Sequence, residues 1–164
     1  MSSRKTRSGR RAAVIASAAA IVVGASVVRM FGRFAVAGDS MRPALEPGDR
    51  LIVGPLGRLS RDAIVIVSDP RRPERQMAKR IVALSGETVV IEGIEITAGP
   101  GEVAVIGDNL AASTDSRTFG AIPTGLVTAR AWYRYAPEHR AGWLEPPRRY
   151  GPPREPVRLT AAPH

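Results

Sequence analysis

Residues 63–91 read AIVIVSDPRRPERQMAKRIVALSGETVVI. Short apolar runs rich in Val and Ile alternate here with the turn formers Asp-Pro and Ser-Gly, as expected for short β-strands joined by turns. The same pattern occurs before this stretch, in FAVAG at residues 34–38 and RLIVG at 50–54. It continues in TVVIEGIEIT at residues 88–97, EVAVIGDN at 102–109 and LVTARAWYRY at 126–135. The sequence therefore predicts an all-β fold, a meander of short strands in which no stretch has a convincing helical pattern.

The net charge of +9 arises outside this central region. Residues 1–33 hold seven basic residues and no acidic one, whereas residues 34–133 hold eleven basic and twelve acidic residues. A DNA-binding domain concentrates basic charge on its folded part, where the charge meets phosphates. The nearly neutral central region therefore argues against nucleic acid as a partner.

Cysteine is absent, and the only histidines are His139 and His164, close to the C-terminal end. These counts exclude disulfides, thiol catalysis and Cys-based zinc sites. They also argue against a Ser-His-Asp triad or a His metal site in the central region. Hydrolytic chemistry would have to use other groups, and neither a metal nor a cofactor is expected.

A basic leader, residues 1–11, precedes the uncharged run AAVIASAAAIVVGASVV at residues 12–28. We interpret residues 12–30 as a transmembrane anchor, with Arg29 and Arg33 able to reach the polar interface at its far end. Five basic residues before the run and two after it predict a cytoplasmic N-terminus and an external C-terminal domain.

The same segment can also be interpreted as a cleaved signal peptide, because Ala-Val-Ala at residues 35–37 has the small residues of a cleavage site. Cleavage there would remove the strand expected before Ser40, and FGRF at residues 31–34 is unusually bulky for such a position. The uncleaved anchor is therefore the preferred interpretation. At the other end, Pro, Arg and Glu prevail, and residues 137–164 are predicted to form a disordered tail.

Lysine is scarce in a chain that holds 22 arginines, since only Lys5 and Lys79 are present. Arginine cannot be deprotonated in a protein, whereas a buried lysine can lose its proton and act as a base. Lys79 lies in the apolar run MAKRIVA, where desolvation would favour the neutral amine. A serine on a neighbouring strand could then pass its proton to Lys79.

Four motifs occur in order: GDSMRPALEPGD at residues 38–49, KRIVALSG at 79–86, GDN at 107–109 and STDSRTFG at 113–120. With the N-terminal anchor, this series resembles the type I signal peptidases, which are membrane-anchored Ser/Lys proteases. The resemblance covers about residues 12–133. Self-cleaving repressors of the LexA type also have a GDSM serine and a later lysine, but they lack the STDSR block and the anchor.

The resemblance implies a role for each matching residue. Ser40 matches the nucleophile, Lys79 the general base, and Ser113 the serine whose hydroxyl orients the lysine amine. The backbone N–H of Ser40 would help to form the oxyanion hole. Gly38 stands where some members have a serine that adds a second hydroxyl donor to the oxyanion hole, so the presence of a second donor in this chain stays open. Met41 would line the substrate cleft.

Four charged residues of the motifs also match the family: Arg80, Asp108, Asp115 and Arg117. They are expected to pair around the site and to hold the lysine and its orienting serine in place. The alternative, that they form surface ion pairs of little energetic value, stays open for each of them.

Two positions depart from the family pattern, because Leu110 replaces the usual Arg after GDN and Ser85 replaces the usual Pro. Neither is assigned to proton transfer. The short interval between Lys79 and Gly107 leaves no room for the large second domain of some bacterial members. The chain therefore resembles the compact form of the enzyme, as in Gram-positive bacteria or organelles.

The predicted fold is thus all-β, with coiled antiparallel sheets that form a partly barrel-like catalytic domain at residues 34–136. The predicted function is cleavage of signal or leader peptides from exported precursors after Ala-x-Ala, by a single-pass protein of the cell membrane. Precursor proteins and the lipid bilayer are the expected partners. Two alternatives stay open, a dedicated maturation protease for one precursor and a catalytically silent membrane scaffold.

Overall fold

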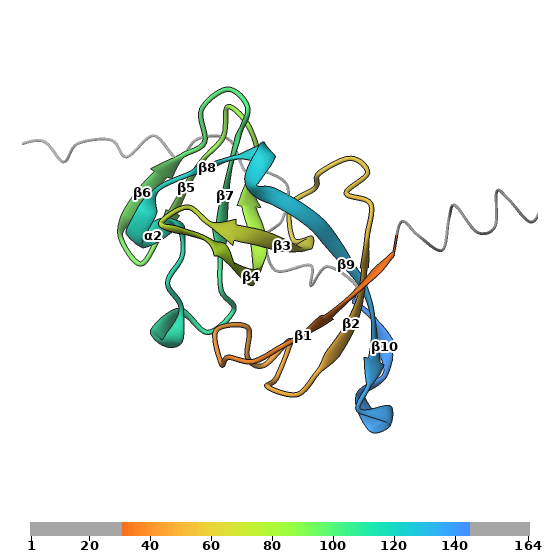
Figure 1. The fold of residues 1–164 in the computed structure, drawn as a ribbon. Helices are drawn as coiled ribbons and strands as arrows, with labels where there is room; N and C mark the ends of the chain where they lie inside the picture. The colour runs from red at the N-terminus through yellow and green to blue at the C-terminus, as the bar shows by residue number, and fades with distance from the viewer. Residues whose placement is uncertain (1–30, 145–164) are drawn as a thin grey trace, which may run out of the picture. The chain divides into compact units, whose positions relative to one another are not determined.

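The computed structural model describes residues 31–144 (Figure 1), which fold mostly into β-sheet, as the sequence predicts. The strands are β1 (Gly32–Ala35), β2 (Arg50–Gly54), β3 (Ile64–Asp69), β4 (Arg72–Ala83), β5 (Thr88–Ile91), β6 (Ile94–Thr97), β7 (Glu102–Ile106), β8 (Ile122–Pro123), β9 (Val127–Ala136) and β10 (Gly142–Trp143). The connections hold the four-residue helix α2 (Ser116–Phe119) and the 3-10 turns η1 (Leu110–Ala112), η2 (Thr124–Leu126) and η3 (Glu138–Arg140).

The predicted leader at residues 1–11, the predicted anchor at residues 12–30 and residues 145–164 of the predicted tail lie outside the described residues. Between residues 31 and 144, no helix has the length and apolar character needed to cross a membrane.

The main sheet has the strand order β1-β2-β9-β3-β4-β7-β8, with β10 paired to β9. This order differs from a simple meander, because the long strand β9 lies between β2 and β3 (Figure 1). The path from β1 to β8 does not join its two ends, so the described part of the sheet is open and not a closed barrel. Bulges interrupt the register of four of its pairings, and such bulges bend the strands.

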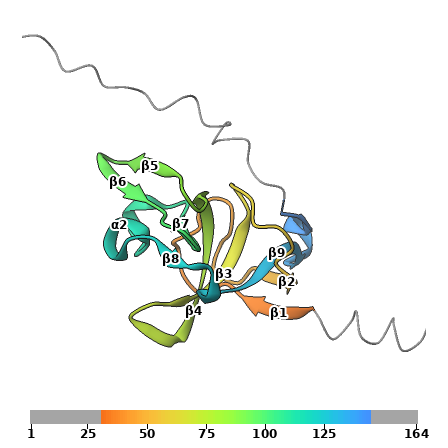
Figure 2. The ribbon, with the colours of Figure 1, turned by 90° about the horizontal axis from the view of Figure 1, so that it is seen from above.

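The stretch TVVIEGIEIT forms a separate two-stranded hairpin, β5–β6, which contacts α2 (Figure 2). The hairpin turns at Glu92 and Gly93, where both residues have positive φ angles of 50° and 79°. Glycine adopts this conformation without steric cost, which explains the turn at this point of an otherwise apolar run.

Strand β4 changes character along its length, and this change positions the site. Its first five residues, RPERQ, are exposed, and its last seven, MAKRIVA, are buried. One edge of β4 pairs with β3, whereas the other edge pairs with β7 only from Arg80 onwards. The buried half packs in the apolar core, where Lys79 and Arg80 are among the largest fully buried side chains.

Residues 137–144, which the sequence placed in the disordered tail, extend the domain beyond its predicted end at residue 136. Strand β10 pairs with β9, and Arg140 of η3 forms ion pairs with Glu46 and Asp49 in the turn before β2. The rings of Tyr133 and Trp143 meet edge to face at 5.3 Å between centroids. These are contacts with distant parts of the chain, which the local composition of Pro, Arg and Glu does not reveal.

Candidate active site

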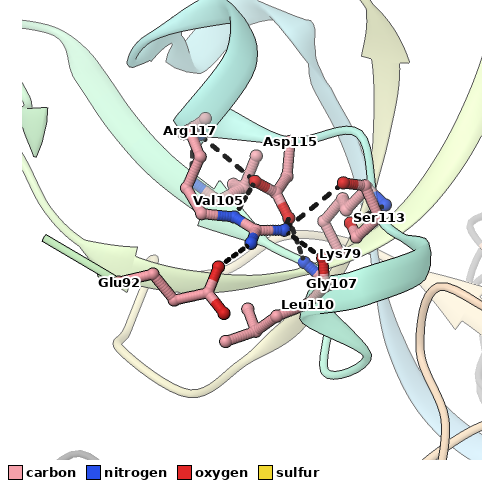
Figure 3. Close-up of polar contacts among 9 residues, drawn as sticks. Lys79, Glu92, Val105, Gly107, Leu110, Ser113, Asp115 and Arg117 are labelled. Carbon is pink, nitrogen blue, oxygen red and sulfur yellow. Dashed lines mark hydrogen bonds and ion pairs between the residues drawn. The ribbon is translucent and has the colours of Figure 1, made fainter. Parts of the chain in front are cut away.

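Lys79 lies in the buried half of β4 with only 2% of its surface exposed. Its Nζ donates a hydrogen bond to the hydroxyl oxygen of Ser113 over 2.9 Å (Figure 3). The residue opposite Lys79 on β3 is the fully buried Val65. The amine therefore sits against apolar strands with one defined polar partner.

Burial lowers the pKa of Lys79 to about 8. The negative charge of Asp115 acts in the opposite direction, and the positive charges of Arg75 and Arg117 lower the pKa of Lys79 further. The carboxylate of Asp69 raises it slightly. At pH 7 about a tenth of such an amine is neutral, compared with well under one part in a thousand for an ordinary lysine.

The buried ammonium predicts that Lys79→Met stabilises the fold at pH 7. The pKa of Lys79 is about 8 in the folded state, against 10.5 for an exposed lysine, so below pH 8 burial of the ammonium costs on the order of 3 kcal/mol. Loss of the bond to Ser113 offsets about 1 kcal/mol of the gain. We expect a net increase of about 2 kcal/mol in the free energy of unfolding, measured with urea.

The pH dependence of this gain follows from proton binding. Between pH 8 and 10.5 the unfolded wild type binds the lysine proton and the folded wild type does not, so wild-type stability rises with pH in this window. The advantage of Lys79→Met should therefore shrink from pH 8 to pH 10.5. A methionine variant that is less stable than the wild type at pH 7 would contradict the assigned burial cost.

Ser113 lies in the loop between η1 and α2, and Asp115 holds this loop in place. Asp115 is fully buried and caps α2 by accepting a hydrogen bond from the Arg117 N–H. It also accepts the Gly107 N–H over 3.1 Å, which joins the loop to the end of β7. Burial alone would raise the pKa of Asp115, but hydrogen bonds from Arg117, Gly107 and Ser113 outweigh it and hold the pKa below its usual value. Asp115 is therefore a fixed negative charge near Lys79.

Arg117 also stabilises the loop that carries Ser113, through hydrogen bonds from its guanidinium (Figure 3). Its guanidinium donates to the carbonyl oxygens of Leu110 over 2.6 Å and Ser113 over 3.3 Å, and it bonds the Asp115 carboxylate over 3.0 Å. It also forms an ion pair with Glu92 at the tip of the β5–β6 hairpin. Arg117 thus connects the Ser113 loop with a second sheet.

Ser40 lies in the turn that follows β1, and its backbone is tied to the segment after β7. The Asn109 N–H donates to the Ser40 carbonyl oxygen over 3.0 Å, and the Asn109 side-chain amide donates to the Asp39 carbonyl oxygen over 3.2 Å. The loop that carries Ser40 is therefore held by a residue about 70 positions later in the chain.

Gly107 lies where this segment passes closest to both serines. A Cβ atom at Gly107 would collide with the Ser113 hydroxyl oxygen and with the Ser40 carbonyl oxygen. The sequence did not single out Gly107 or Asn109 as site residues, although both belong to the GDN motif. That motif was the available signal, since Gly permits a close approach of backbone segments.

Arg80 and Asp108 form a separate cluster next to the site. The Arg80 guanidinium makes two bonds of 2.7 and 2.5 Å to the Asp108 carboxylate and a third to the Asp62 carbonyl oxygen. Arg80 is 1% exposed and neighbours Lys79 on β4, so its side chain points to the opposite face of the strand. This pair braces β4 and does not line the cavity described next.

A cavity of about 200 Å³ brings Ser40 and Lys79 together with Gly38 and Met41. The other residues that line it come from residues 34–37, residues 75–78, Ala112 and Thr114. In the described part of the chain, the hydrogen bond of Lys79 is with Ser113 and none joins Lys79 to Ser40. Between residues 31 and 144, no group of three acidic or histidine side chains could hold a metal ion.

This arrangement can perform proton-transfer chemistry. A hydroxyl and a buried amine of lowered pKa share one cavity, and the amine is oriented by a second hydroxyl. A neutral amine accepts a proton, and a serine that loses its proton becomes a nucleophile.

Comparison with known proteins gives consistent matches. A family model described as "Signal peptidase, peptidase S26" matches residues 9–99 and 95–136. The mitochondrial ATP-independent inner membrane protease subunit 1a of Arabidopsis thaliana is 34% identical over 122 residues, which cover 66% of this chain and 73% of the relative. Subunit 1 of the human mitochondrial inner membrane protease is 32% identical over 123 residues, covering 65% and 70%. Subunit 2 from Mus musculus is 33% identical over 129 residues, covering 70% and 74%. The chain therefore belongs to the signal peptidase family, peptidase S26.

Proposed function

We propose that this chain is a membrane-anchored serine endopeptidase that removes signal or leader peptides after small residues, with Ser40 as nucleophile and Lys79 as general base. The observation that carries the proposal is the buried Lys79 amine, whose pKa is lowered to about 8 and which shares a cavity with Ser40. Membership of a peptidase family supports the same class of reaction.

The first step is attack of the Ser40 hydroxyl oxygen on the scissile carbonyl carbon, while its proton passes to Lys79. The C–N bond then breaks, and Lys79 gives the proton to the leaving amine. The product is an ester between Ser40 and the N-terminal part of the substrate. The backbone N–H of Ser40, which has no acceptor among residues 31–144, is available to stabilise the oxyanion.

The second step releases the ester by hydrolysis. Lys79, neutral again, takes a proton from a water molecule, and the resulting hydroxide attacks the ester carbon. The bond between the Ser40 Oγ and the acyl carbon of the substrate breaks, and the Ser40 Oγ takes back a proton from Lys79. Ser113 keeps the amine oriented throughout, because its hydroxyl accepts the Lys79 hydrogen bond.

The substrate would bind as an added β-strand. Within residues 31–144, the edge of β4 before Arg80 has no partner strand on the β7 side, and residues 75–78 line the cavity together with residues 34–37. An extended peptide between these segments could bond to backbone groups, a common mode of peptide recognition. Its first and third residues before the cut would face the same side, where a small apolar space accepts Ala.

The membrane setting rests on the uncharged run at residues 12–28 and on relatives that are named inner membrane proteases. We propose a cytoplasmic N-terminus and an external catalytic domain in the cell membrane. Protease added to spheroplasts should then digest residues 34–144, and full protection of these residues would contradict the orientation.

The function is tested by incubating the detergent-solubilised chain with a panel of secretory precursors and sequencing the new N-termini. We expect cuts after Ala-x-Ala, and no cut by Ser40→Ala under the same conditions. Cleavage of a single member of the panel would indicate a dedicated maturation protease. Cleavage that persists in Ser40→Ala would contradict Ser40 as the nucleophile, and absence of cleavage by the wild type would favour a silent scaffold.

Ser113→Ala is expected to lower kcat by about 100-fold, a typical size for the loss of one contribution to proton transfer. KM should change little, because Ser113 does not line the cavity. Ser113→Thr, which keeps a hydroxyl, should recover part of the activity. Circular dichroism controls for folding, and near-normal kcat in a folded Ser113→Ala would remove Ser113 from the mechanism.

A further inference from the structure

Arg75 lines the cavity but has no part in the proposed chemistry. It lies in the exposed half of β4, and its side chain is exposed to solvent. Among residues 31–144, Lys79 is the only other ionisable residue that lines the cavity, and no acidic side chain of this range lines it. The described lining of the cavity therefore carries a permanent positive charge and no carboxylate that could neutralise it.

The lack of a partner distinguishes Arg75 from most other arginines of the domain. Seven arginines form ion pairs with acidic residues: Arg42, Arg61, Arg71, Arg80, Arg117, Arg134 and Arg140. Arg75 forms none among residues 31–144. Asp69 lies within range of its charge, but Asp69 is 1% exposed and its carboxylate accepts the backbone N–H and side chain of Arg71.

The charge of Arg75 reaches the reaction centre. It is one of the two positive charges that help to lower the pKa of Lys79, the other being Arg117. Arg75 and Lys79 are four residues apart on one strand, which corresponds to about 13 Å. A substrate strand lying beside β4 would therefore place one of its side chains next to Arg75 about four residues from the scissile bond.

We propose that Arg75 is a specificity residue, which binds an acidic side chain of the substrate about four residues from the scissile bond and disfavours a basic side chain there. This inference rests on the proposed function for the position of the cut. It follows from the unpaired, solvent-exposed guanidinium and from the absence of carboxylates among the described residues that line the cavity, because opposite charges attract and like charges repel even in an exposed pair.

Binding to the Ser40→Ala variant of the full chain tests this inference without turnover. The probes are fluorescein-labelled peptides with a central Ala-x-Ala sequence. Each peptide carries Asp, Asn or Lys at a single position, and the series tests each of the five positions on either side of the cut in turn. An exposed ion pair changes affinity by up to about fivefold. We expect Asp peptides to bind up to about fivefold more tightly than Asn peptides, and Lys peptides more weakly, at one position only. The difference should shrink in 1 M salt.

Two further variants assign the effect to Arg75. In the Ser40→Ala background, Arg75→Gln should remove the difference between Asp and Lys peptides, and Arg75→Glu should reverse it. Arg72→Gln is the matched control, because Arg72 is an exposed arginine of the same strand that does not line the cavity. It should leave the difference unchanged. Equal affinities for Asp and Lys peptides at every position, or a preference that survives Arg75→Gln, would overturn the inference.

Cleavage of the neutral Asn peptides by the chain with Ser40 intact separates the two proposals. If these peptides are cut and the binding shows no charge preference, the proposed function stands and the role of Arg75 fails. If Asp peptides bind selectively through Arg75 and no peptide is cut, the role of Arg75 stands and the proposed function fails.

Discussion

Lys79→Arg is expected to reduce cleavage by at least 1,000-fold, as much as Lys79→Ala, although arginine keeps the positive charge. The proposed role of Lys79 is to accept the Ser40 proton as a neutral amine, and a guanidinium cannot do so in a protein. General-base catalysis contributes about 100- to 10,000-fold, and the activated nucleophile depends on it entirely. Initial rates on one precursor, with circular dichroism of both variants, measure the effect.

The pH profile of the wild type provides a second measurement on the same residue. The pKa of Lys79 is lowered to about 8, so the fraction of neutral base rises tenfold per pH unit below 8 and levels off above it. We expect kcat/KM to follow that curve. An active Lys79→Arg variant, or a flat profile between pH 6 and 8, would contradict general-base catalysis by Lys79.

Gly107→Ala is expected to lower kcat/KM by about 100-fold while the protein stays folded. The new Cβ would collide with the Ser113 hydroxyl oxygen and the Ser40 carbonyl oxygen, so both loops of the site must shift. A displacement of about 1 Å in a catalytic group can cost about 100-fold in rate. Overpacking of this kind also costs about 1–3 kcal/mol in the free energy of unfolding.

Gly125→Ala is the matched control for this substitution, because a Cβ at Gly125 would meet no atom within 4 Å. It should change neither the rate nor the urea midpoint by a measurable amount. Normal cleavage by Gly107→Ala would show that the loops of Ser40 and Ser113 can separate without loss of function. It would contradict the conclusion that activity depends on their close approach at Gly107.

Part of the site can be predicted from sequence because it depends on residue type. Ser40 and Lys79 stand out by motif and by the scarcity of lysine, and the structure places both at one cavity. Burial of Lys79 could be expected from the apolar run around it, and the structure gives 2% exposure. The structure joins Lys79 and Ser113 by a hydrogen bond, and the orienting role that the family resemblance implied for Ser113 stays a prediction.

Other features depend on contacts between distant residues, so local sequence does not contain them. The need for glycine at position 107 arises from the approach of Ser40 and Ser113, which lie on separate loops. The order of residues 137–144 arises from pairing with β9 and from ion pairs to Glu46 and Asp49. Neither can be inferred from residues within a few positions along the chain.

The sequence by itself determined the stretches that overlap β1, β2, β3, the buried half of β4, β5, β6, β7 and β9, because alternation of β-branched residues with turn formers is a local property of the chain. It also identified the serine and the single central lysine. It did not indicate β8, β10 or the exposed half of β4. Only the tertiary structure decided that β9 lies between β2 and β3 and that Arg80 faces away from Lys79. It also decided that no strand of residues 31–144 pairs with β4 beside Arg75 on the β7 side. Strand pairing is selected by burial of whole apolar faces against each other, and that energy depends on all the strands at once.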